Sequence, residues 1–251
     1  MIHVSIRVDD IRSKMSDFEL DNLNTICSRP NINVYLAYTP KWLECSGLGD
    51  EKKYKQSKVT SSLCLKTLSC IKNLLDRPNT VLGQHGFYHY YKIRELKKWA
   101  ISGRATRTFI PEWKMIDEIS FTRDLEIGAE IIKQIFNDSP KFVSPPSNAL
   151  SSAARSVCIQ KGIKICAAEN PYLNILASEM FYRIPFVPLS SILTLYLPIY
   201  SEYAVQRLVK RLNNNGRNIN KIMLLVHPWE LKQASFKSVL NAVQDILGKC
   251  A

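Results

Sequence analysis

Short apolar runs typical of strands alternate along the chain with longer segments whose apolar residues recur at helical spacing. The first run, residues 2–8, alternates apolar and polar side chains, as a β-strand does. Ser16 and Glu19 then stand at capping-box spacing at the start of a segment with helical periodicity. We expect further strands at residues 33–38, 80–83, 141–143, 163–167, 186–187, 192–197 and 222–226. We expect further helices at residues 61–75, 116–136, 149–161, 202–212 and 236–247.

This alternation of strands and helices predicts a mostly parallel α/β arrangement. The 251 residues are enough for one α/β domain of barrel size, and neither a repeat nor a linker divides them, so residues 1–251 are treated as a single domain. Residues 42–58 and 90–113 are expected to be loops. The second of these segments is basic and aromatic, and loops of such length are often lids or binding loops.

Polar side chains that can take part in chemistry follow four of the predicted strands. They are Asp9, Asp10, His85, His89, residues 145–148 and His227. In α/β barrels the active site is built at the carboxyl ends of the strands, so these four segments are expected to meet. Their agreement supports a site more strongly than any one segment does alone.

His85 and His89 form a His-x-x-x-His unit in a chain that has only four histidines. If the segment after His85 turns helically, both imidazoles lie on one face and can bind one divalent metal ion. Such an ion usually needs a third protein ligand and an open position for water, and Asp9 and Asp10 are the candidates. One carboxylate would bind the metal, while the other would accept a proton from water whose pKa the metal lowers.

Each of these patterns also has a structural interpretation when it is taken alone. Adjacent aspartates such as Asp9 and Asp10 are common in turns and helix caps. The three histidines, His85, His89 and His227, could equally be structural side chains that bond to the backbone. Both interpretations remain open at the level of the single motif.

The 34 basic and 22 acidic side chains give a formal net charge of +12, which favours anionic partners. Nucleic acid, a membrane surface and a phosphorylated small molecule all fit this charge, and the charge does not choose among them. The basic residues are spread over 52–58, 94–107 and 207–221, which is more typical of a solvated surface than of a binding tail. No recognised nucleic-acid motif is present, so no nucleic-acid partner is expected.

The cysteines and the hydropathy pattern predict a cytoplasmic protein. The seven cysteines are odd in number and include no Cys-x-x-Cys, which indicates reduced thiols in a reducing compartment. No signal peptide precedes the first predicted strand. The most apolar stretch, residues 184–200, is interrupted by Pro185, Pro188 and Pro198, so no transmembrane segment is expected.

Taken together, these segments resemble the polysaccharide deacetylase family, carbohydrate esterase family four, over nearly the whole chain. The family has an Asp-Asp pair after the first strand, then His-x-x-x-His, then a proline-containing loop, and a Leu-x-His motif near the end. The matching segments, in the same order, are Asp9-Asp10, His85 with His89, the loop at 144–148 (a partial match) and Leu225-Val226-His227.

The resemblance implies a distorted (β/α) barrel, often with seven strands, and a metal-dependent hydrolase that removes an N-acetyl (or O-acetyl) group from a sugar. By the family pattern, Asp10, His85 and His89 are the ligands of a divalent metal, usually Zn²⁺. Asp9 is the general base that acts on metal-activated water. His227 is the general acid that protonates the leaving group.

The resemblance also suggests where the substrate binds. Pro146, Ser147 and Asn148 lie in the proline-containing loop, where a backbone N–H near Ser147 would stabilise the oxyanion. Independently of the resemblance, Trp229 could form a platform for a sugar ring together with Phe87, Tyr88, Tyr90 and Tyr91, although packing in the core or at its rim is the more common role of such residues taken one by one. The chain departs from the family pattern at Ser144, where the family has an arginine that helps to orient the base. The family's later acidic motif, an Asp followed by Asp-Trp, is not found.

We therefore expect a cytoplasmic carbohydrate deacetylase that acts on an intracellular precursor in surface-polysaccharide biosynthesis. The substrate would be an N-acetylated sugar, such as a nucleotide-linked or lipid-linked sugar, and the basic segment at 94–107 would attract its diphosphate. The alternatives are a catalytically inactive carbohydrate-binding protein of the deacetylase type, a nucleic-acid-binding protein on the basis of the charge alone, and another metal-dependent amidase.

Overall fold

The structure is a computed structural model, and the parts of the chain that it describes are ten ranges. These are residues 3–28, 32–41, 64–89, 91–95, 107–146, 149–166, 172–177, 180–185, 192–196 and 221–229. Four predicted elements lie outside the described residues and stay predictions: the loop at 42–58, the strand at 186–187, and the helices at 202–212 and 236–247.

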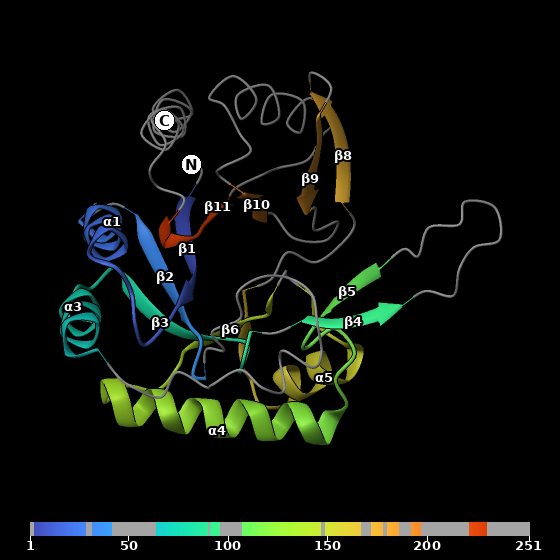
Figure 1. The fold of residues 1–251 in the computed structure, drawn as a ribbon, viewed down its shortest axis with the longest axis horizontal. Helices are drawn as coiled ribbons and strands as arrows, with labels where there is room; N and C mark the ends of the chain where they lie inside the picture. Colours follow the sequence, from blue (N-terminus) through green and yellow to red (C-terminus); the bar gives the residue numbers. More distant parts are fainter. Residues whose placement is uncertain are drawn as a thin grey trace.

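A parallel sheet of seven strands forms the centre of the structure (Figure 1). All six neighbouring pairs of its strands are parallel. In spatial order the strands are β10 (Ile192–Tyr196), β11 (Lys221–Val226), β1 (His3–Ile11), β2 (Asn33–Tyr38), β3 (Thr80–His85), β6 (Phe142–Ser144) and β7 (Lys164–Ile165). The parallel α/β architecture predicted from the sequence is confirmed.

The sheet curls into a half-barrel, and it is open among the described strands. Its two edges, β10 and β7, do not pair with each other. Ile6 and Val8 of β1 are fully buried, as are Val34 and Leu36 of β2, as expected for parallel strands inside a layered α/β fold. The architecture is consistent with a (β/α) barrel of the deacetylase type, and closure into a seven-stranded barrel remains a prediction.

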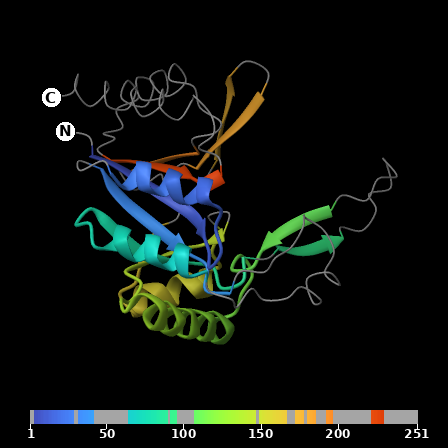
Figure 2. The ribbon, with the colours of Figure 1, turned by 60° about the vertical axis from the view of Figure 1, so that its left-hand side comes forward.

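Four helices of the described ranges lie outside the curled sheet (Figures 1 and 2). They are α1 (Asp17–Cys27), α3 (Leu65–Leu75), α4 (Glu118–Phe136) and α5 (Ser152–Gln160). The predicted capping box is confirmed: Ser16 Oγ accepts the N–H of Glu19, and the Glu19 carboxylate accepts the N–H of Ser16 at 2.7 Å. None of these helices combines the length and the apolar character that crossing a bilayer requires.

Two antiparallel hairpins were not predicted from the sequence. The first pairs β4 (Tyr91–Glu95) with β5 (Arg107–Pro111), and it lies in the segment 90–113 that was expected to be a loop. The second pairs β8 (Tyr172–Ala177) with β9 (Met180–Pro185). The expectation of a structureless loop at 90–113 was wrong, because the partner of β4 lies beyond residue 106 and local periodicity does not reveal such pairing. Figures 1 and 2 show the β4–β5 hairpin projecting from the body of the sheet.

Helix α4 packs against the end of β3 at a position that only glycine fits. A Cβ atom on Gly128 would lie 2.2 Å from Nε2 of Gln84, which is fully buried. That Nε2 donates to the carbonyl oxygens of Gly86 and Asp124, both at 3.1 Å. The Gln84 amide therefore ties α4 to the turn that follows β3, and this turn carries His89.

Replacing Gly128 with alanine tests this packing, because the packing and the helix propensity predict opposite changes in stability. Helix propensity alone favours alanine over glycine by about 1 kcal/mol. The clash with Gln84 should reverse that sign, and we expect the free energy of unfolding to fall by about 1–3 kcal/mol. Urea denaturation measures the change, with Lys133→Ala on the exposed face of α4 as the control. A Gly128→Ala protein as stable as the wild type, or more stable, would contradict the packing.

Candidate metal centre

Asp10 lies in a bulge of β1 and not beyond its end. The strand was predicted to stop at Asp9 and Asp10, but it continues to Ile11, and its register against β2 shifts between Val8 and Ile11. Asp10 has a φ of 60°, in the left-handed region that Asp tolerates better than most residues. A bulge re-aims side chains that would otherwise alternate between the two faces of a strand, and here both carboxylates are buried.

His85 and His89 meet through a tight turn that is not helical. Strand β3 runs through His85, two residues beyond its predicted end. Gly86 and His89 both have positive φ, at 60° and 55°, so the condition of a helical turn after His85 is not met. The expectation that the two imidazoles lie together is nevertheless confirmed, because their ring centroids are 4.9 Å apart.

Glu112, which the sequence analysis did not single out, holds this turn in place. Its buried carboxylate accepts the backbone N–H groups of Phe87, Tyr88 and His89 at 2.7, 3.0 and 3.1 Å. Gly86 is required beside it, because a Cβ at that position would lie 1.9 Å from Glu112 Oε1. Burial raises the pKa of Glu112, although these backbone donors oppose the shift. No local signal marks Glu112, since its partners are more than 20 residues away.

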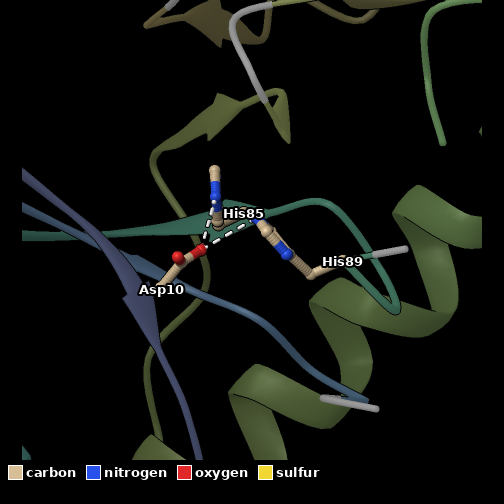
Figure 3. Close-up of side chains that lie close together, drawn as sticks. All are labelled: Asp10, His85 and His89. Atoms are coloured by element: carbon tan, nitrogen blue, oxygen red, sulfur yellow. Dashed lines mark ion pairs between the residues drawn. The ribbon is translucent and has the colours of Figure 1, made fainter. Parts of the chain in front are cut away.

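The three predicted metal ligands converge on one point (Figure 3). Asp10 Oδ1 lies 3.0 Å from His85 Nε2 and 2.9 Å from His89 Nε2. Asp10 and His85 are buried, and His89 is half-buried. Within the described ranges these are the residues whose ligand atoms could hold a metal ion, all within 4.8 Å of one another.

The hydrogen bond made by the His85 ring supports a site that fits a cation. Its Nδ1 lies 2.9 Å from the carbonyl oxygen of Ser144, which can only accept, so Nδ1 carries the hydrogen. In the neutral ring, Nε2 then presents a lone pair toward Asp10 Oδ1, which lies 3.0 Å away on a buried carboxylate. Two lone pairs facing each other repel unless a positive charge lies between them. Ligand atoms of a tetrahedral Zn²⁺ site are separated by roughly 3.4 Å. The two distances from Asp10 Oδ1 to the histidine nitrogens, 3.0 and 2.9 Å, are somewhat shorter.

The pKa values of Asp10 and His89 are shifted in the directions that favour an ionised carboxylate and a positively charged imidazole. Burial raises the pKa of Asp10, but the neighbouring His89 and His85 outweigh it, and the pKa falls well below its ordinary value. Burial lowers the pKa of His89, but the Asp10 carboxylate outweighs it, and the pKa is raised. Protons and a metal ion therefore compete for the same atoms.

Asp9 borders the ligand cluster without belonging to it. Its Oδ2 forms an ion pair with Arg7 at 2.9 Å, and its Oδ1 accepts a hydrogen bond from Ser144 Oγ at 3.2 Å. Oδ1 also lies 3.9 Å from Nδ1 of His85. Burial raises the pKa of Asp9, but the Arg7 guanidinium is the first of several charges that outweigh it, so the pKa is lowered and the group is ionised at neutral pH.

His227 reaches the same cluster from the end of β11. Its Nε2 lies 3.5 Å from Asp10 Oδ2, so strands β1, β3 and β11 bring their polar residues together as predicted. The ring stacks on Trp229 with the centroids 4.9 Å apart and the planes 9° apart. The guanidinium of Arg12 lies 5.5 Å from the Trp229 ring centroid. Trp229 is partly exposed, and its role as a sugar platform stays a prediction.

The predicted substrate loop is described only in part. Pro146 is buried, and its Cγ would lie 2.8 Å from a Cβ placed on Gly86, so it packs beside the turn between the two histidines. Ser147 and Asn148 lie outside the described residues, and their predicted roles in substrate binding stay predictions.

No protein-family model matches the sequence, and no curated protein matches it. Solved structures do match over nearly the whole chain. One is a peptidoglycan N-acetylglucosamine deacetylase in complex with 4-naphthalen-1-yl-N-oxidanyl-benzamide. It is 11% identical with a TM-score of 0.52, and the match covers 99% of this chain and 83% of that chain. A family 4 carbohydrate esterase from Streptomyces lividans, in complex with acetate, is 13% identical with a TM-score of 0.50. The match covers 98% of this chain and 88% of that chain.

A pseudoenzyme of the same family from Bacillus anthracis is 10% identical with a TM-score of 0.49, over 98% of this chain. This chain spans only 61% of the length of that protein. At such low identities the matches show a shared fold. The resemblance to carbohydrate esterase family four predicted from the sequence is confirmed at that level.

Removal of a ligand should abolish metal binding. Wild-type protein incubated with zinc and then desalted is expected to retain about one equivalent, and Asp10→Asn and His89→Ala are expected to retain almost none. Elemental analysis measures the metal content, and Asp21→Asn, an exposed carboxylate of α1, is the control. A wild-type protein that stays metal-free after incubation with zinc, cobalt and nickel would contradict the assignment.

Glu112 should influence metal affinity although it is not a ligand. Glu112→Gln replaces one acceptor oxygen with an NH₂ donor, which at the position of Oε2 would face the backbone N–H of Tyr88. We expect the free energy of unfolding to fall by about 1.5–3 kcal/mol and the zinc dissociation constant to rise about tenfold or more. Urea denaturation and competition with a zinc-binding dye measure the two changes. Glu130→Gln on the exposed face of α4 is the control, and unchanged zinc affinity in Glu112→Gln would refute the role.

Proposed function

We propose that the chain is a divergent family-four carbohydrate esterase, a metal-dependent deacetylase that removes an N-acetyl (or O-acetyl) group from a sugar. The observation that carries the proposal is the convergence of Asp10 Oδ1, His85 Nε2 and His89 Nε2 on one point. Asp9 and His227 border that point and supply the base and the acid that hydrolysis of an amide needs. The fold shared with deacetylases supports the same conclusion.

A divalent ion held by these three atoms would polarise the acyl carbonyl and lower the pKa of water, and we propose Zn²⁺ as that ion. The role of the protein is to present two imidazole nitrogens and one carboxylate oxygen in a fixed geometry. The Ser144 carbonyl sets the tautomer and the orientation of His85. Glu112 fixes the backbone of His89.

Asp9 is proposed as the general base. Its carboxylate is ionised and buried on the β1 bulge beside Asp10, so it is available to accept a proton from water that attacks the acyl carbon. Arg7 and Ser144 hold one oxygen each, which restricts the rotation of the carboxylate.

His227 is proposed as the general acid. An amine cannot leave as an anion in water, so its nitrogen must receive a proton as the C–N bond breaks. The imidazole of His227 lies beside Asp10 Oδ2, and stacking on Trp229 fixes the plane of its ring. It therefore faces the cluster from the β11 side, while Asp9 faces it from β1.

We propose an N-acetylated biosynthetic precursor as the substrate, such as a nucleotide-linked or lipid-linked sugar of a surface polysaccharide. The net charge of +12 supports an anionic substrate, and the β4–β5 hairpin carries Arg94 and Arg107. Five cysteines of the described ranges are free thiols, which supports a reducing compartment and the proposed cytoplasmic location.

A second candidate function is carbohydrate binding without turnover. The observation that favours it is Ser144, which stands where the resembled family has an arginine beside the base. A zinc-loaded wild-type protein that binds N-acetylated sugars but releases no acetate from any of them would favour this candidate over the deacetylase.

Loss of the base should abolish turnover without loss of metal. Wild-type protein loaded with zinc is expected to release acetate from at least one member of a panel of N-acetylated sugars, sugar nucleotides and lipid-linked sugars. Asp9→Asn should lower kcat by about 10²–10⁴-fold while keeping about one equivalent of zinc. Acetate is measured by a coupled assay, with Asp21→Asn as the control. An Asp9→Asn protein with wild-type kcat would contradict the role of the base.

A further inference from the structure

We propose that Arg7 is the positioning residue for Asp9, and that its guanidinium does from β1 what an arginine at the position of Ser144 does in the resembled family. This inference rests on the proposed function, because Asp9 acts as a base only if the chain is a hydrolase. It concerns a residue that lies outside every motif on which the sequence analysis relied.

The geometry of Arg7 is that of a fixed side chain. Arg7 is fully buried, two residues before Asp9 on β1. One terminal nitrogen donates to the carbonyl oxygen of Cys166, just beyond β7, and the other lies 2.9 Å from Asp9 Oδ2. The backbone N–H of Cys166 in turn donates to the carbonyl of Val143 on β6 at 2.8 Å. The guanidinium is thus anchored at one end to the far edge of the sheet, and it contacts the Asp9 carboxylate with the other end.

The second oxygen of Asp9 is held from β6, which lies three strands away from β1 in the sheet. Ser144 Oγ donates to Asp9 Oδ1 at 3.2 Å, and Ser144 is fully buried at the end of β6. The position that holds arginine in the resembled family therefore does contact the Asp9 carboxylate here, but with a short hydroxyl group. The positive charge comes from Arg7, on the same strand as Asp9.

Arginine suits this task because its planar guanidinium presents several N–H groups in a rigid fork. One end of the fork binds a backbone carbonyl and the other binds Asp9, so a rotation of the carboxylate would break a charge-assisted hydrogen bond. The carboxylate carries a catalytic proton only if it faces the attacking water, and a misplacement of about 1 Å can lower the rate about 10²-fold.

A purely structural interpretation is that Arg7 balances the charge of a buried aspartate and has no effect on turnover beyond stability. The two interpretations differ in whether the effect of Arg7 on kcat requires the Asp9 carboxylate. A double-mutant cycle in kcat separates them, because a residue that acts only through Asp9 loses its effect once Asp9 can no longer act as a base.

The experiment compares wild type, Arg7→Met, Asp9→Asn and the double variant as zinc-loaded proteins. Arg7→Met is expected to lower kcat about 10²-fold, with KM within about threefold of the wild type and with about one equivalent of zinc retained. In the Asp9→Asn background the same change should lower kcat by no more than about twofold. Arg7→Lys keeps the charge without the fork and should recover part of the activity lost in Arg7→Met.

The matched control is Arg123→Met, which removes an exposed guanidinium from α4 and should leave kcat unchanged. An equal loss of kcat from Arg7→Met in both backgrounds, or a loss of zinc from Arg7→Met, would overturn the proposal. A wild-type kcat in Arg7→Met would overturn it as well.

A parallel cycle in urea denaturation keeps the inference testable even without turnover. If Arg7 holds Asp9, Arg7→Met should destabilise the wild type more than it destabilises the Asp9→Asn protein. Equal destabilisation in both backgrounds overturns the contact on which the inference depends. Absence of acetate release by the wild type would instead contradict the proposed function, so the two failures are distinguishable.

Discussion

The candidate site depends on one electrostatic constraint, which is that the Asp10 carboxylate is buried against two imidazole nitrogens that point at the same oxygen. A buried carboxylate is costly unless positive charge accompanies it. The Ser144 carbonyl takes the Nδ1 hydrogen of His85, so the Nε2 that faces Asp10 has no hydrogen to offer in the neutral ring. The arrangement therefore favours a cation at this point.

The surrounding structure stabilises this arrangement through backbone conformations that are otherwise unfavourable. Asp10 and His89 both adopt positive φ, which costs free energy for residues other than glycine. Parallel pairing of β1 with β11 on one side and β2 on the other holds the bulge at Asp10. Three backbone N–H groups bonded to Glu112 hold the turn at His89. Strain at these candidate ligands is thus offset by contacts made elsewhere in the sheet and in the segment before α4.

Much of the fold and of the site was predictable because the relevant signals are local. Short apolar runs marked the strands of the sheet, and Ser16 with Glu19 marked the start of α1. The rule that parallel strands carry chemistry at their carboxyl ends then predicted that Asp10, His85 and His227 would meet. These predictions needed only periodicity and strand direction.

The parts that the sequence did not predict depend on contacts between distant segments. The bulge at Asp10 appears only as a shift of register against β2, and the non-helical turn at His89 is set by Glu112. Glu112 itself lies in a segment that looked like a basic loop and carries β5 of a hairpin. Arg7 reads as a polar residue of an alternating strand, and nothing local indicates that it is buried beside Asp9. Each of these features requires knowledge of which residues are neighbours in space.

The most direct test of the metal centre is the position of bound zinc in crystals of the zinc-loaded protein, located by anomalous scattering at the zinc edge. The account predicts one strong peak bonded to Asp10 Oδ1, His85 Nε2 and His89 Nε2, at distances of about 2.0–2.2 Å. That result would show that the three atoms form one site with room for a further ligand. No peak at this point, or a peak bound to other side chains, would contradict the central claim.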